Sequence, residues 1–215
     1  KNYKFDTRGN INKFETHLKK PLKKYFNEEE ISNLTFKDLD FLLKLSSDKK
    51  NYVKAKGLYQ TSGTQFQNFK LENNFKKNEL KIKLDLDYAE VLNFELINYN
   101  KKQDIVANLY LDLIINKNLI LFNNIKFLEN ENSIEIQKLQ IKDKNLISLN
   151  NIKVKTLKNG KENNNFEVNF QKEINIKGNV YDASNINKIL SKKSKNNFLS
   201  KISKNINIEI QNIDT

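Results

Sequence analysis

The stretch that decides the fold is Leu80-Lys81-Ile82-Lys83-Leu84-Asp85-Leu86-Asp87-Tyr88. Its apolar residues alternate one by one with charged residues. Because successive side chains of a β-strand point to opposite faces, this alternation predicts a strand with one apolar and one charged face. A helix would distribute the same apolar residues around its whole circumference.

The same alternation recurs on both sides of this stretch. Apolar stripes lie within residues 39–45, 53–59, 69–75, 92–96, 105–115, 125–127, 134–136, 147–154, 166–176 and 206–210. Asparagine-rich separators at 73–74, 98–102, 116–118, 123–124, 130–132, 150–151 and 159–165 are predicted turns, because Asn tolerates a positive φ. No helical crossover is expected to make strands parallel, so the sequence predicts an all-β fold built as a long antiparallel meander.

The whole chain, 1–215, is expected to be one β-rich segment of a larger protein, since no linker divides it. The meander is expected over about 36–178, short helices over about 18–28 and 184–193, and a terminal strand over about 204–212. Many strands should be long, about 10–12 residues.

Composition excludes several kinds of chemistry. The chain has no Cys, one His and five Gly, which leaves no thiolate nucleophile, no multi-His metal centre and no glycine-rich phosphate loop. The formal charge of +12 comes from Lys rather than Arg, since Arg8 is the single arginine, and indicates a solvated lysine surface. We therefore expect no enzyme activity, no cofactor, no metal and no specific nucleic-acid partner.

A sheet with one apolar face must cover that face by closing into a barrel, by packing on a second sheet, or by curling around an apolar ligand. The stripes contain almost no polar residue that could orient a small polar metabolite, which favours acyl chains as the ligand. The candidate groove lining is Leu80, Ile82, Leu84, Leu86, Leu92, Phe94, Leu96, Ile105, Leu109, Leu111 and Leu113. An ordinary closed core built from the same residues remains an alternative.

The stretch from Ile174 to Leu190 resembles a strand-to-helix segment of the AsmA-like proteins, in particular the YhdP-type branch. Gly178, Tyr181, Asp182 and Ala183 stand at the matching places, where the strand ends and a short Leu-rich helix follows. The resemblance extends in style over about residues 35–195. It implies a protein anchored in the inner membrane of a Gram-negative-type bacterium, with a long sheet in the periplasm that curls into an open, taco-like groove. Such a protein would move phospholipids between the inner and outer membranes.

Other polar residues are read as ordinary surface. His17 is isolated, and the paired acids Asp85/Asp87 and Asp104/Asp112 are interpreted as solubilising charge. The lysine pairs at 49–50, 76–77, 101–102 and 192–193 would protect sheet edges or meet anionic head groups.

The functional prediction is a periplasmic segment that shields phospholipid acyl chains. Its expected partners are those chains, a membrane reached through an anchor outside this segment, and neighbouring β segments of the same protein. The alternative is a structural or adhesive envelope β-sandwich or β-solenoid module with a closed core and no lipid.

Overall fold

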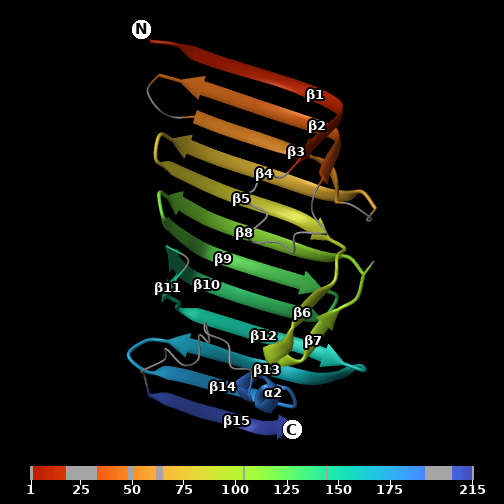
Figure 1. Cartoon of the computed structure of the whole chain (residues 1–215), viewed down its shortest axis with the longest axis vertical. Coiled ribbons are helices and arrows are strands. Elements are labelled where there is room, and N and C mark those ends of the chain that lie inside the picture. The colour runs from red at the N-terminus through yellow and green to blue at the C-terminus, as the bar shows by residue number, and fades with distance from the viewer. Residues whose placement is uncertain are drawn as a thin grey trace.

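The computed structural model describes residues 2–17, 33–47, 51–61, 65–103, 105–143, 145–191 and 205–214. Within these ranges the chain forms one large sheet (Figure 1). Its strands are β1 (Lys4–His17), β2 (Asn33–Ser46), β3 (Asn51–Thr61), β4 (Gln67–Lys76), β5 (Glu79–Tyr88), β8 (Ala107–Asn116), β9 (Leu119–Glu129), β10 (Asn132–Lys142), β11 (Asn145–Ser148), β12 (Asn151–Lys158), β13 (Lys161–Phe170), β14 (Ile174–Asp182) and β15 (Ile206–Asp214).

The sheet is an open meander, as predicted. The strand order is β1-β2-β3-β4-β5-β8-β9-β10-β12-β13-β14-β15, with β11 attached to β10. The first and last strands lie at opposite ends of the sheet (Figure 1), so the sheet is not closed into a barrel. Irregular register between β2 and β3, β8 and β9, β12 and β13, and β13 and β14 adds local bends, since a β-bulge increases strand twist.

The pairing of β14 with β15 is parallel, whereas the other pairs of the sheet are antiparallel. The expectation of no crossover was therefore wrong at this one place. The connection between these strands includes α2 (Ile186–Ser191), which lies inside the range expected for a helix. A parallel pair requires the connection to bring the chain back to the end of β14 at which that strand begins, so that Ile206 pairs with Ile174.

Several asparagines occupy turns with left-handed backbone, among them Asn98 (φ 48°), Asn130 (φ 51°) and Asn159 (φ 54°). The turns predicted at 73–74 and 123–124 were wrong, because those residues lie inside β4 and β9. The helix expected over 18–28 falls outside the described residues, and His17 is the last residue of β1.

The polar face of the sheet carries a ladder of amides across six adjacent strands, from Asn124 through Gln137, Asn151, Asn169 and Asn175 to Asn207. Two links of this ladder are side-chain hydrogen bonds, from Asn151 Nδ2 to Asn169 Oδ1 (2.9 Å) and from Asn207 Nδ2 to Asn175 Oδ1 (3.2 Å). Exposed ion pairs such as Lys54–Glu72 (2.7 Å) also join strands. Such exposed pairs add little stability, and their main effect is to keep this face solvated.

Two short strands stand apart from the large sheet. β6 (Leu92–Phe94), the 3₁₀ helix η1 (Glu95–Ile97) and β7 (Tyr99–Lys101) form a hairpin with its own two-stranded sheet. This covering hairpin, residues 92–101, lies across the strands of the C-terminal half of the large sheet (Figure 1). Ile97 and Tyr99 of the hairpin pack with Phe127 of β9 in a buried apolar cluster between the hairpin and the large sheet.

Candidate functional site

The apolar side chains form rows that run across the sheet, perpendicular to the strands. Directly paired residues of neighbouring strands point to the same face, so the register defines each row. One row takes a nonpolar residue from every strand on the main path of the sheet: Gly9, Phe41, Ala55, Leu71, Leu84, Leu111, Ile125, Ile136, Ile152, Val168, Ile176 and Ile208. We call the surface that carries this row the apolar face.

A second row runs beside the first over most of the sheet. It consists of Phe69, Leu86, Leu109, Phe127, Ile134, Val154 and Phe166. Many side chains of the two rows are half-buried, among them Leu71, Leu84 and Leu111, although Phe69 and Phe127 are fully buried. The apolar face is thus continuous along the sheet, and among the described residues many of its side chains are only partly covered.

The structure brings together the predicted lining residues of β5 and β8. Three pairs consist of two predicted residues, Ile82–Leu113, Leu84–Leu111 and Leu86–Leu109, whereas Leu80 faces Ile115, which was not among the candidates. The remaining candidates lie elsewhere. Ile105 precedes β8 and is exposed, whereas Leu92 and Phe94 belong to the covering hairpin and pack down onto the apolar face. Leu96, in η1, is also exposed.

Aromatic contacts attach the covering hairpin to the apolar face. The rings of Phe94 and Tyr99 both meet the ring of Phe127 edge to face, with centroid distances of 6.2 and 5.8 Å. The hydroxyl of Tyr99 donates a hydrogen bond to the carboxylate of Glu129, which is buried. Burial, this hydrogen bond and the charge of Glu129 together raise the pKa of Tyr99, so its proton stays in place.

The tip of the hairpin is held by Asp182, the acidic residue of the family-like segment. Its carboxylate is almost fully buried and accepts hydrogen bonds from Asn98 Nδ2 (2.9 Å), Asn163 Nδ2 (3.3 Å) and Lys158 Nζ (3.3 Å). The backbone N–H and the hydroxyl of Ser184 also donate to it. Burial alone would raise the pKa of Asp182, but the bonds from Ser184, Asn98 and Asn163 outweigh burial and lower it.

Asn164 completes this attachment. Its role was missed because residues 159–165 were predicted to be a turn, whereas β13 begins at Lys161. The residue is fully buried in β13. Its Nδ2 donates to the carbonyl of Ile97 (2.7 Å) and to Thr156 Oγ1 (2.8 Å), while its Oδ1 accepts from the Asp182 N–H (3.1 Å). We call Asp182, Asn98, Asn163 and Asn164 the clasp.

The other three residues that carry the AsmA-like resemblance, Gly178, Tyr181 and Ala183, lie in the same region. Gly178 lies against β13, where a Cβ would come within 2.5 Å of the Phe166 Cβ. The hydroxyl of Tyr181 donates to the carbonyl of Leu96 (3.0 Å), and its ring meets that of Phe166 edge to face. Ala183 is buried, and its N–H donates to the carbonyl of Asp214 (2.7 Å). Tyr181 and Asp182 therefore join β14 to the hairpin, whereas Gly178 lets β14 approach β13 and Ala183 bonds to β15.

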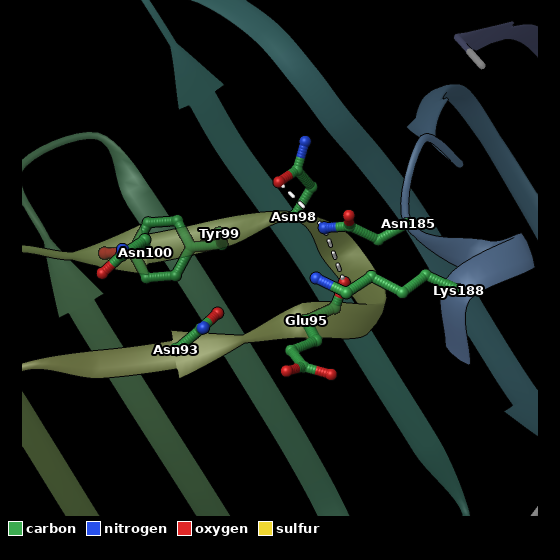
Figure 2. Close-up of a pocket in the computed structure, with 7 residues that line it drawn as sticks. All are labelled: Asn93, Glu95, Asn98, Tyr99, Asn100, Asn185 and Lys188. Carbon is green, nitrogen blue, oxygen red and sulfur yellow. Dashed lines mark hydrogen bonds between the residues drawn. The ribbon is translucent and has the colours of Figure 1, made fainter. Parts of the chain in front are cut away.

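A small pocket of about 150 Å³ lies between the hairpin and α2. Figure 2 shows the seven residues that line it, with Lys188 extending from α2 towards the hairpin. Asn185 Nδ2 bridges the two elements by donating to the carbonyl of Glu95 (3.4 Å) and to Asn98 Oδ1 (3.0 Å). The lining is polar, so this pocket is unsuited to an acyl chain and serves to join α2 to the hairpin tip.

The base of the hairpin has a second polar attachment. Lys101 is fully buried, and its ammonium donates to the carbonyls of Glu90 (2.8 Å) and Lys102 (3.0 Å). The same ammonium lies 5.6 Å from the centre of the Tyr88 ring, a distance typical of a cation–π contact. Lys101, which we predicted to protect a sheet edge or meet a head group, is therefore a buried structural residue.

The acidic pairs lie on the polar face with amide partners. Asp85 accepts a hydrogen bond from Asn108 (2.6 Å), Asp87 from Asn68 (2.8 Å) and Asp112 from Asn123 (3.1 Å). Asp104 and the side chain of His17 lie outside the described residues. In the part of the chain that the structure describes, His, Cys, Asp and Glu form no group that could hold a metal ion.

No helix among the described residues is long and apolar enough to cross a membrane. Comparison of the chain with protein-family models, curated proteins and solved structures gave no match in any of the three.

Proposed function

We propose that this chain shields the acyl chains of phospholipids on the apolar face, as one segment of an AsmA-like protein in the periplasm. The observation that carries the proposal is the row that crosses all twelve strands of the main path and stays largely nonpolar from β1 to β15. A compact core needs no such continuity, whereas a surface along which an acyl chain lies or moves does.

The energetic case rests on the hydrophobic effect. Each CH₂ group kept from water contributes about 0.8 kcal/mol, so a chain of ~16 carbons needs shelter worth on the order of 10 kcal/mol. The row positions Leu71, Leu84 and Leu111 are half-buried and supply apolar surface that the protein does not fully cover. The polar head group of the phospholipid would remain in water, beyond the edge of the apolar face.

The family-like segment supports the same proposal. Gly178, Tyr181, Asp182 and Ala183 meet at the end of β14, immediately before α2. If the chain is an AsmA-like segment of the YhdP type, an anchor outside this segment holds it at the inner membrane, and neighbouring β segments continue the sheet. Phospholipid transport between the two membranes is the activity that this proposal assigns to the complete protein.

Lipid extraction followed by mass spectrometry of the purified chain tests the proposal. We expect co-purifying phospholipid, and we expect Leu84→Asp and Leu111→Asp to abolish it while the sheet stays folded. Lys83→Asp is the matched control, because it places the same carboxylate on the opposite face of β5. Lipid-free preparations of the unmodified chain under several mild extraction conditions would rule the proposal out.

A second candidate is a structural or adhesive envelope module with a closed core and no lipid. The cluster beneath the covering hairpin favours it, because Ala107, Phe127 and Val154 are as buried there as in an ordinary core. Under this alternative Leu84→Asp should unfold the protein, with a loss of more than about 3 kcal/mol, since a charge would enter a dry core.

A further inference from the structure

The covering hairpin is a separable layer. Among the described residues it forms its own two-stranded sheet, and no backbone-to-backbone hydrogen bond joins it to the large sheet. Its side chains belong to one packed cluster with side chains from six of the twelve strands of the main path, β8, β9, β10, β12, β13 and β14. The connecting residues Val91 and Val106 on either side of it are exposed.

The surface beneath the hairpin belongs to the same rows that line the rest of the apolar face. Leu109, Phe127, Ile134 and Val154 continue the row that begins at Phe69 and Leu86. Phe94, Ile97 and Tyr99 cover this part with apolar side chains, which is the role that an acyl chain would have on the uncovered part.

We infer that the surface beneath the covering hairpin is a second part of the acyl-binding face, and that the hairpin is a strap that an acyl chain displaces. This inference rests on the proposed function. The strap and the acyl chain compete for one surface, because each of them covers the same side chains of β9, β10 and β12. With the strap lifted, the apolar face is open along its whole length.

The clasp determines where the strap stays attached. At the tip, Asp182 accepts a hydrogen bond from Asn98, and Asn164 donates one to the carbonyl of Ile97. Along its body, the strap is held by apolar contacts, which an acyl chain can replace, and by the hydrogen bond from Tyr99 to Glu129. The clasp is therefore the attachment that has to open at the tip before the strap can lift.

The experiment uses a strap that can be locked. The chain has no Cys, so Asn98→Cys combined with Ser184→Cys places the only two thiols at the tip, where the two native side chains lie 3.1 Å apart. A short bismaleimide joins them. The control is Asn10→Cys with Asp40→Cys, which carries the same reagent between β1 and β2 on the polar face.

The probe is a phospholipid with a photoreactive diazirine in its acyl chain, and the crosslinked residues are mapped by mass spectrometry. Before locking, we expect crosslinks on β4 and β5 and also on β9, β10 and β12. After locking the tip, the crosslinks on β9, β10 and β12 should disappear, while those on β4 and β5 should remain. The control pair should show no change on locking.

The outcomes separate the two proposals. Crosslinks on β4 and β5 alone, in both the locked and the unlocked protein, would overturn the strap and leave the proposed function standing. Crosslinks on β9, β10 and β12 that persist after locking would also overturn it. The absence of specific crosslinks in every state would remove the proposed function and the strap together.

Discussion

Asp182→Asn is the substitution that tests the clasp most directly. The change keeps the size of the side chain but replaces one acceptor oxygen with an NH₂ group, which then faces the donors Asn98 and Asn163. A hydrogen bond to a buried charged group contributes about 1.5–3 kcal/mol. Lys158 is half-exposed, so its ion pair adds little. We expect the free energy of unfolding to fall by roughly 3 kcal/mol at pH 7.

The measurement is urea unfolding followed by circular dichroism, with Asp40→Asn as the control. Asp40 accepts a hydrogen bond from Asn10, as Asp182 does from Asn98, but it lies exposed on the polar face, so its substitution should change stability very little. Equal effects of the two substitutions would refute the claim that the clasp is a buried, stabilising network.

The pH dependence gives a second reading of the same substitution. The folded-state pKa of Asp182 lies below its ordinary value of 3.8, so the stabilisation is fully present above that value and is lost as the pH falls through and below it. The difference in stability between the unmodified chain and Asp182→Asn should therefore shrink when unfolding is repeated near pH 3. A difference that stays constant from pH 7 to pH 3 would contradict the assignment of a charged, hydrogen-bonded Asp182.

Three further substitutions test other parts of the structure by the same unfolding assay. Gly178→Ala should cost about 1–3 kcal/mol, because the added Cβ overlaps the adjacent strand, and a neutral result would refute that close approach. Tyr99→Phe removes the hydroxyl that donates to buried Glu129 and should cost about 1–3 kcal/mol; no loss would mean that this hydrogen bond is not needed. Asn73→Leu should stabilise the chain by about 1 kcal/mol, because the Asn73 Oδ1 is buried in an apolar row without a hydrogen-bond partner among the described residues; destabilisation would show that this oxygen has a role.

Residue alternation was enough to predict most of the strands and their apolar face. The stretch from Leu80 to Tyr88 matches β5 almost residue for residue. Leu84 and Leu111, which belong to two different predicted stripes, pair directly in the sheet. Side-chain direction in a strand depends only on neighbouring residues, so a local pattern is sufficient. β1 was missed, because Phe5, Thr7, Gly9 and Ile11 alternate too weakly to be read as an apolar stripe.

Turns were predicted less well, for a reason that the asparagines make clear. Asn98 and Asn130 do occupy left-handed positions, but Asn73 and Asn124 lie inside β4 and β9. An asparagine favours a turn only where no neighbouring strand pairs with its backbone. Both strands have partners on each side, and the ladder hydrogen bonds outweigh the local preference.

By itself, the sequence determined that this protein is an all-β chain with one apolar face. The tertiary structure decided that Leu92 and Phe94, which alternate like the residues of any other strand, leave the sheet and cover it, while β5 pairs directly with β8. It also decided that Asp182, near the end of a strand, meets Asn98 from a hairpin 84 residues away in the sequence. Alternation fixes which way a side chain points, but the pairing of distant segments depends on the total surface that each arrangement buries, and no local pattern carries that information.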